Sequence, residues 1–362
     1  MMKTPLSPFR FIKTTFVFLT AIPLTATFIY AATLSDTEKS QKREELDRFF
    51  SEALIRTQAE AAKKVHQAFR FTATGTTRVG YDSNVDLNDS DEDGDAFHEQ
   101  QAAARLEYAP ESAAIFGHAV AVGVEGRFGY LGYFDRDDLN RQSGLASPYL
   151  RIEINPDMYL ETAYQFKSRI YENREELSYL SNGVKTTLNH QITPGLTHKV
   201  FFRYEKLDYT DRKALLSGAT FTGGDREDDR YEIAYAIRKR TGIWTFSLEG
   251  NWVWNDSNDE YFDYNDYDDG GLEGAVSARV TERTVITAFG GWHSRMYDGR
   301  KIAPVFDRIQ EDDWYYTGGR IFYALNTWSG IDATLTYYAN DSNDGNRDYD
   351  SVITSVGLHL YF

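Results

Sequence analysis

The sequence has no cysteine, little proline and a deficit of positive charge. Of its 362 residues none is Cys and 8 are Pro, and 55 acidic residues outnumber 39 basic ones, for a net charge of −16. Without Cys there is no disulfide framework, thiolate metal site, cysteine nucleophile or lipoprotein acylation site. The negative charge also argues against nucleic acid as a partner, because neutralising phosphates takes clustered Lys and Arg.

Aromatic residues and glycine are plentiful. Aromatics make up 15% of the chain, with 25 Tyr, 23 Phe and 27 Gly, yet the mean hydropathy is only −0.52. Aromatic side chains favour strands, and polar segments rich in Gly favour turns and loops. The composition therefore predicts a β-rich protein with long polar connections.

The first 31 residues have the pattern of an export signal. Lys3, Arg10 and Lys13 precede an apolar run over 14–32 that ends in small residues. This order predicts a cleaved signal peptide over 1–31, with an uncleaved membrane anchor as the alternative. No later stretch approaches the roughly 18 consecutive apolar residues of a transmembrane helix. An exported chain of this kind is either soluble or a barrel.

Residues 32–68 have helical periodicity. Ser35 and Glu38 form a capping box, and the apolar residues that follow recur at helical spacing: Leu46, Phe49, Phe50, Leu54, Ala61, Val65 and Ala68. We expect one amphipathic helix, which either plugs a barrel lumen or contacts a periplasmic partner, or another copy of itself, through 36–68.

From residue 69 to the end the period changes to two. Val200, Phe202 and Tyr204 alternate with charged or polar neighbours, and Tyr231, Ile233, Tyr235 and Ile237 do the same. We expect about fourteen strands, at 69–81, 99–108, 116–130, 147–155, 158–170, 177–190, 196–207, 230–239, 243–254, 271–281, 284–296, 313–324, 330–339 and 351–362.

The predicted connections alternate between short and long. Tight turns such as 156–157 and 282–283 alternate with mostly long polar loops such as 208–229 and 255–270. Outer-membrane barrels have short periplasmic turns on one rim and long extracellular loops on the other. The polar faces also carry many charges of both signs. We therefore predict that residues 69–362 form an all-β transmembrane antiparallel barrel and not a soluble β-sandwich.

The last eight residues resemble the C-terminal assembly signal of Gram-negative outer-membrane proteins. Ser355 begins the segment, Gly357 and Leu360 occupy the specified glycine and apolar positions, and Phe362 is the terminal aromatic residue. The resemblance implies insertion by the barrel assembly machinery into the outer membrane of a Gram-negative bacterium.

Two further segments are similar to a family of outer-membrane β-barrel porins. Tyr81 to Val85 reads YDSNV, and Asn340 to Asn343 with Tyr349 and Asp350 gives a matching SN…YD pattern near the end. This family is linked to exopolysaccharide export, and a related pattern occurs in barrel domains of surface-lipoprotein assembly modifiers. The resemblance implies export of a surface polysaccharide.

In a barrel the polar faces of the strands line the lumen. The inward candidates carry charges of both signs and sum close to neutral, which suits either a water-filled channel that orients a polar solute or a lumen braced by Arg–Glu pairs. The principal lumen candidates are Arg105, Arg127, Arg151, Glu153, Glu161, Lys167, Arg169, Lys199, Arg203, Glu205, Arg230, Glu232, Arg238 and Glu249.

One acidic loop has the spacing that opens a calcium-binding loop. Asp89, Asp91, Asp93 and Asp95 alternate along the chain, and Gly94 would allow the sharp turn. The glutamate expected at the twelfth position is replaced by Gln100. The default interpretation is a solvated loop that divalent ions bridge to lipopolysaccharide, and calcium binding is the alternative; no other cofactor is expected.

These features predict an outer-membrane channel, either for passive diffusion of polar solutes or for polysaccharide export. The alternative is a non-conducting structural or interaction barrel with acidic, cation-binding loops. The expected partners are outer-membrane lipid and lipopolysaccharide. The seven His residues are scattered, so no catalytic Ser–His or Asp–His arrangement is apparent and we do not expect an enzyme.

Overall fold

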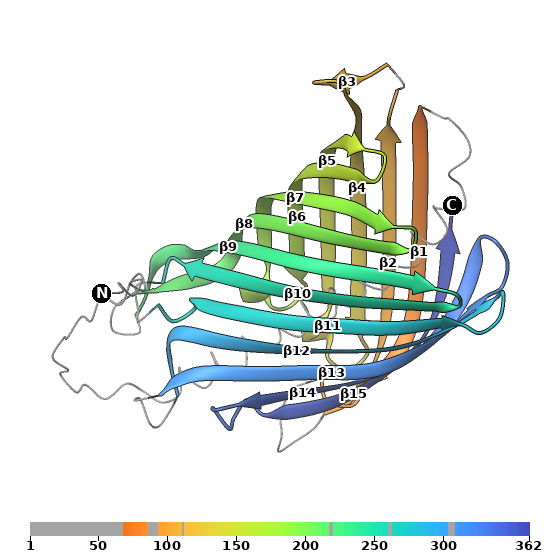
Figure 1. Ribbon diagram of the computed structural model, residues 1–362. Helices are drawn as coiled ribbons and strands as arrows, with labels where there is room; N and C mark the ends of the chain where they lie inside the picture. The colour runs from red at the N-terminus through yellow and green to blue at the C-terminus, as the bar shows by residue number, and fades with distance from the viewer. Residues whose placement is uncertain (1–67, 86–92, 111, 217–219, 260–262, 303–307) are drawn as a thin grey trace, which may run out of the picture.

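The chain forms one closed antiparallel sheet. The computed structural model describes residues 68–85, 93–110, 112–216, 220–259, 263–302 and 308–362 (Figure 1). Its strands are β1 (Phe69–Asp82), β2 (Asp95–Tyr108), β3 (Ala114–Ile115), β4 (His118–Tyr133), β5 (Arg141–Asn155), β6 (Met158–Tyr171), β7 (Tyr179–Thr193), β8 (Leu196–Leu216), β9 (Thr220–Thr241), β10 (Trp244–Ser257), β11 (Tyr267–Arg279), β12 (Thr284–Lys301), β13 (Ile309–Ala324), β14 (Ser329–Ser342) and β15 (Tyr349–Tyr361).

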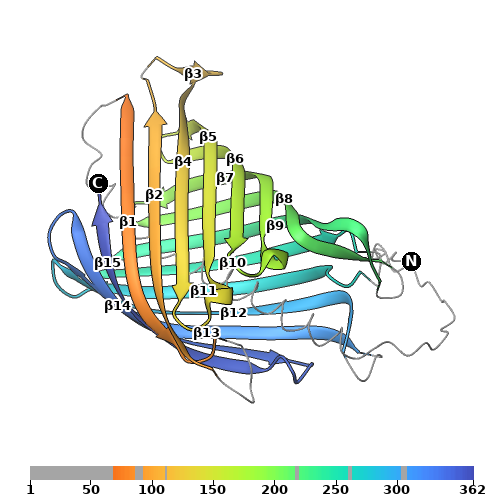
Figure 2. The same ribbon diagram turned by 180° about the vertical axis from the view of Figure 1, so that it is seen from behind.

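The sheet closes between its first and last strands. β1 pairs with β15 from Thr74↔Tyr361 to Asp82↔Ile353. Ala73 and Phe362 also exchange two backbone hydrogen bonds, at 2.9 and 2.8 Å. β2 pairs with β4, so the two-residue β3 stands outside the ring as a small ribbon at one rim (Figure 2). The predicted fourteen-stranded antiparallel barrel is thereby confirmed.

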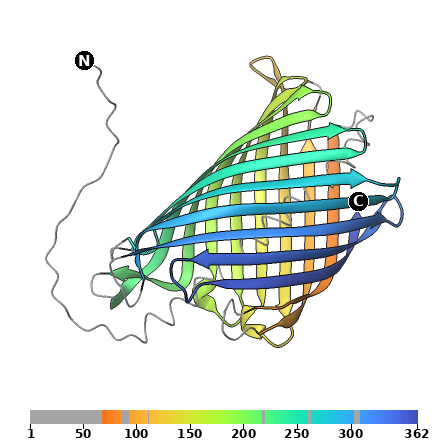
Figure 3. The same ribbon diagram turned by 60° about the horizontal axis from the view of Figure 1, so that its bottom comes forward.

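The strands are strongly tilted. In Figures 1 and 3 the strands of the near wall cross those of the far wall at a steep angle. Closing a sheet into a barrel requires such tilt, and a closed barrel leaves no strand edge without hydrogen-bond partners. The lumen is therefore enclosed by a continuous hydrogen-bonded wall.

The predicted signal peptide over 1–31 and almost all of the predicted helix over 32–68 lie outside the described residues. Among the residues that are described, no helix is long and apolar enough to cross a membrane. The helices that are described are two single 3₁₀ turns, Asp137–Leu139 and Glu175–Leu177.

The outer surface of the barrel is apolar. Exposed aliphatic side chains such as Val124, Leu248 and Leu335 cover its middle. Exposed aromatic residues mark both edges of this zone: Phe69, Phe71, Tyr108, Trp244, Phe246 and Tyr323 toward the short-turn rim, and Tyr81, Phe128, Tyr231, Trp252, Trp254, Trp292 and Tyr315 toward the long-loop rim. An apolar band between aromatic girdles is the lipid-facing surface of an outer-membrane β-barrel, so the protein belongs in the outer membrane, as predicted.

The two rims differ as expected. Gly195 and Gly242 occupy tight turns at one rim with positive φ of 82° and 57°, a conformation that glycine adopts without strain. The opposite rim carries the longer loops. Of these, the predicted 208–229 loop is wrong, because β8 continues to Leu216 and β9 begins at Thr220. These extensions are charged on both faces, since no lipid contacts them, and so lack the alternation from which strands are predicted.

Three segments at the long-loop rim share a pattern, Tyr-x-x-Arg-x-x-Leu, which repeats every 38 residues. Its members are Tyr133, Arg136 and Leu139; Tyr171, Arg174 and Leu177; and Tyr209, Arg212 and Leu215. All three Tyr and all three Leu side chains are buried. In the first two copies the next residue, Asn140 or Ser178, accepts a hydrogen bond from the Tyr N–H, at 2.7 and 2.9 Å. The first two copies therefore form locally folded turns, whereas the third lies within β8.

Candidate functional site

Charged side chains line the lumen along one parity of most strands. On β6, for example, Glu161, Lys167 and Arg169 alternate with the exposed Thr162, Phe166 and Ile170. The structure places every predicted lumen residue on this inward parity, although Glu153 is exposed near the short-turn rim. They are Arg105, Arg127, Arg151, Glu153, Glu161, Lys167, Arg169, Lys199, Arg203, Glu205, Arg230, Glu232, Arg238 and Glu249.

The lumen contains a cavity of about 550 Å³ with an excess of positive charge. Eleven basic residues line it against five acidic ones. The basic residues are Arg70, Arg105, Arg127, Arg151, Lys167, Arg169, Lys185, Lys199, Arg203, Arg230 and Arg295; the acidic ones are Glu107, Glu125, Glu161, Glu205 and Asp269. The expectation of a nearly neutral lumen is therefore not met around this cavity, where the wall is cationic although the whole chain is acidic.

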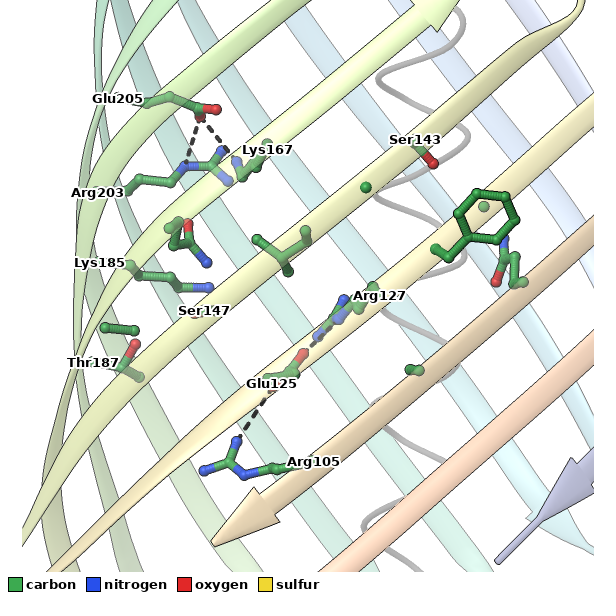
Figure 4. Close-up of a pocket in the computed structure, with 18 of the residues that line it drawn as sticks. Arg105, Glu125, Arg127, Ser143, Ser147, Lys167, Lys185, Thr187, Arg203 and Glu205 are labelled. Carbon is green, nitrogen blue, oxygen red and sulfur yellow. Dashed lines mark hydrogen bonds and ion pairs between the residues drawn. The ribbon is translucent and has the colours of Figure 1, made fainter.

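Part of the cationic wall is a network on β2, β4, β5 and β6. Arg105 Nη2 donates to Glu161 Oε2 at 2.7 Å and lies 3.5 Å, through Nη1, from Glu125 Oε2. Arg127 Nε donates to Glu125 Oε1 at 2.5 Å, and Arg151 Nη2 to Glu107 Oε1 at 2.5 Å. Figure 4 shows the Arg105–Glu125–Arg127 chain lying along the wall. The pairs hold these arginines against the strands.

A second part of the wall centres on Glu205 of β8. Its carboxylate accepts hydrogen bonds from Lys167 Nζ at 3.0 Å and Ser181 Oγ at 2.5 Å, and lies 3.8 Å from Arg203 Nε (Figure 4). Arg203 also pairs with Glu232 on β9. Glu205 is 4% exposed, so one carboxylate organises cations from two strands.

The cavity is lined mainly by one part of the wall. Small residues on β1 to β7 face it: Thr72, Thr74, Thr76, Ala103, Gly129, Ser143, Ser147, Ala163 and Thr187. Most of the lining residues belong to β1 to β9, and so do ten of the eleven basic ones; Arg295 on β12 is the other. The cavity therefore lies against the part of the wall that carries most of its cations.

A buried histidine lies on the inner face of β12. His293 Nδ1 is 3.2 Å from Asp269 Oδ1, and its Nε2 is 3.1 Å from Glu273 Oε1. The imidazole stacks on Trp314 at a centroid distance of 5.0 Å, and Arg295 donates to Asp269 at 2.9 Å. This group was not predicted, because Gly and aromatic residues fall on both faces of β12 and hide its inward parity.

The predicted calcium residues are only partly described. Asp89 and Asp91 lie outside the described residues. Asp93 is exposed, and Asp95 is buried and accepts hydrogen bonds from the backbone N–H groups of Asp135 and Arg136, both at 2.9 Å. In the described part of the chain no group of three or more His, Asp or Glu is arranged to hold a metal ion. Calcium binding stays a prediction.

The predicted assembly signal forms the strand that closes the barrel. Gly357 is buried on the inward side, where a Cβ atom would lie 2.5 Å from Asp332 Oδ1. Leu360 is on the outward parity, and Phe362 is exposed beside β1. Recognition by the assembly machinery stays a prediction, as does the absence of enzymatic activity.

No family model matches the chain, and no curated protein matches it. Similar solved structures include outer-membrane-expressed OmpT of Vibrio cholerae, 11% identical over 82% of this chain and 99% of that chain, with a TM-score of 0.46. OprB of Pseudomonas putida is 10% identical over 82% and 94%, with a TM-score of 0.45. An anion-selective porin from Comamonas acidovorans is 10% identical over 81% and 99%, with a TM-score of 0.44. These distant likenesses carry no inference about function.

Proposed function

We propose that the protein is an outer-membrane channel that passes small polar anions in preference to cations. The observation that carries this proposal is the excess of basic over acidic side chains, eleven to five, around the lumen cavity. Charges of one sign on a low-dielectric wall concentrate the oppositely charged solute and set the selectivity of a pore. Fixed Lys and Arg side chains therefore favour anions.

The direction of the ion pairs supports an open path over a braced, occluded lumen. Arg105–Glu161 joins β2 to β6, Lys167–Glu205 joins β6 to β8, and Arg203–Glu232 joins β8 to β9. The paired strands are adjacent (β8 and β9), two places apart (β6 and β8) or three places apart (β2 and β6) in the sheet, so the pairs run along the wall. The pairs hold the side chains back from the cavity.

Ion selectivity in planar bilayers tests the proposal. We expect the mature chain to conduct. Under a potassium chloride gradient, its reversal potential should have the sign of the chloride equilibrium potential. A second protein lacking residues 36–66 shows whether that segment limits the current. Cation selectivity in a conducting protein contradicts the proposal. If neither protein conducts, the non-conducting structural barrel is the better account.

Export of a surface polysaccharide is a finer form of the same proposal. The cationic wall would suit a polymer that carries carboxylate or phosphate groups. We expect an oligosaccharide of uronic acids to reduce the chloride current at lower concentration than a neutral oligosaccharide of equal length. If the two oligosaccharides reduce the current equally, polysaccharide export is contradicted and anion passage stands.

A further inference from the structure

Building on the proposed function, we propose that the lumen wall contains a binding subsite for dianionic solutes, bearing a phosphate or two carboxylates, centred on Lys185. Lys185 on β7 stands directly opposite Arg203 on β8 in the strand ladder. Like charges in directly opposed positions destabilise a sheet. A dianion that lies between the two cations can accept hydrogen bonds from both.

The neighbouring cations have fixed positions. Arg203 is 9% exposed and pairs with Glu232, while Lys167 donates to Glu205 at 3.0 Å. The Lys185 ammonium lies 4.2 Å from the centroid of the Phe201 ring, a cation–π contact that orients it. A ligand therefore meets a preformed arrangement and orders few side chains on binding.

Small side chains leave room for the ligand. Ala163 faces Lys185 from the other side, on β6, and Ser147 and Thr187 line the same cavity with hydroxyl groups. In Figure 4 Lys185, Arg203 and Lys167 project from one region of the wall, near Ser147 and Thr187. Phosphate and carboxylate oxygens accept hydrogen bonds from both ammonium and hydroxyl groups.

The nearby carboxylates limit the strength of binding. Glu205 and Glu232 offset part of the charge of Lys167 and Arg203, so the subsite carries a net positive charge without being a tight trap. A conducting channel needs binding that is favourable enough for entry and weak enough for release. The subsite would therefore slow the chloride current when a dianion occupies it.

Current block by added dianions measures this binding. The wild-type chain is held in potassium chloride at pH 8 and titrated with inorganic phosphate or, separately, with succinate. We expect the chloride current to fall to half at a defined dianion concentration. Lys185→Gln should raise that concentration about tenfold, which is the effect of losing one charge-assisted hydrogen bond. Lys185→Arg should stay near wild type.

Two further variants make the test specific. Lys206→Gln removes a lysine of the outer face, paired with Glu227, and should leave the block unchanged. Ala163→Asp places a carboxylate opposite Lys185 and should weaken the block as Lys185→Gln does. Because this change adds a stabilising opposite-charge pair to the sheet, the variant should still assemble. It therefore provides the test if Lys185→Gln fails to assemble.

The outcomes separate the subsite from the channel. If the wild type is anion-selective but Lys185→Gln and Ala163→Asp leave the block unchanged, the subsite is wrong and the proposed function stands. Cation selectivity overturns both. Block by phosphate alone supports a phosphate subsite, block by succinate alone supports a dicarboxylate subsite, and block by neither overturns the subsite.

Discussion

At the scale of single residues, Glu205 lowers the anion selectivity of the lumen and at the same time stabilises the barrel. It is 4% exposed and holds Lys167, Ser181 and Arg203. Glu205→Gln should shift the reversal potential further toward chloride, because the cations lose their counter-charge. It should also lower the free energy of unfolding in urea by about 3 kcal/mol, since breaking a buried pair leaves uncompensated charge.

Glu249→Gln is the matched control for this change. Glu249 lies 3.7 Å from Lys199 Nζ, and its side chain is 17% exposed, so solvent screens the pair. We expect the same direction of selectivity change with a smaller loss of stability. If the two variants lose the same free energy of unfolding, burial of the carboxylate does not determine that loss.

Two loop carboxylates have pKa values displaced in opposite directions. Arg136 donates to Asp138 at 2.9 Å and holds the pKa of Asp138 below its usual value. Burial raises the pKa of Asp266 to about 7, and the nearby charges of Asp256, Asp263 and Asp298 add to the rise. Of these two carboxylates, Asp266 is the one that titrates between pH 5 and pH 8, because Asp138 stays ionised throughout.

The Asp266 loop should be better ordered at low pH. Its pKa is raised on folding, so its contribution to stability is present near pH 4 and is lost as pH rises through 7. We expect hydrogen-exchange protection of the Ser257 amide, which donates to Asp266 at 2.7 Å, to fall from pH 5 to pH 8 after correction for intrinsic rates.

Asp266→Asn should abolish that dependence. The amide has no proton to lose in this range, and its oxygen can still accept the Ser257 hydrogen bond. Protection in the variant should be nearly level between pH 5 and pH 8. A variant with the wild-type slope would show that another group controls the loop.

Single residues could be assigned to the lumen from the sequence where charged and apolar residues alternate regularly along a strand. On β6 and β8 the charged residues alternate with apolar ones, so Lys167 and Glu205 could be assigned to the lumen. His293 and Arg295 could not, because on β12 Gly290 and Gly291 fall on opposite faces and aromatic residues occupy both. A glycine carries no side chain that could indicate which face is lipid-exposed.

At the scale of elements, the turns formed by the first two Tyr-x-x-Arg-x-x-Leu segments stabilise the long-loop rim. In the second copy Leu177 is fully buried, and Arg174 donates to Glu176 at 3.2 Å. The repeat is invisible to a search for strand periodicity, because it lies where the alternation stops. Its 38-residue spacing is nevertheless readable from the sequence once hairpins of equal length are compared.

Leu177→Ala should cost about 2–5 kcal/mol, the usual range for emptying a buried leucine site. Asn173→Ala changes an exposed residue of the same loop that makes one hydrogen bond of 3.5 Å, so it is the control. The free energy of unfolding in urea reports both. A loss below 1 kcal/mol for Leu177→Ala would mean that the turn does not contribute to global stability.

At the scale of the whole molecule, the barrel was predictable and the asymmetry of its lumen was not. Strand number, rim type and lipid-facing parity follow from patterns local to each hairpin. The position of the cavity depends on which strands face each other across the lumen, and therefore on tilt and closure. Only the closed structure shows that the cavity is lined mainly by β1 to β9, with small side chains of β1 to β7 along it.

This asymmetry predicts that solutes pass along the small-residue wall. Ala103 on β2 faces the cavity, between Thr74 and Arg127 in the ladder, and its neighbour Ala102 faces lipid between Gly75 and Phe128. Ala103→Trp should lower single-channel conductance by about half or more, because the ring enters the path. Ala102→Trp joins the outward aromatic side chains and should conduct like wild type. Equal conductance of the two variants would place the path elsewhere in the barrel.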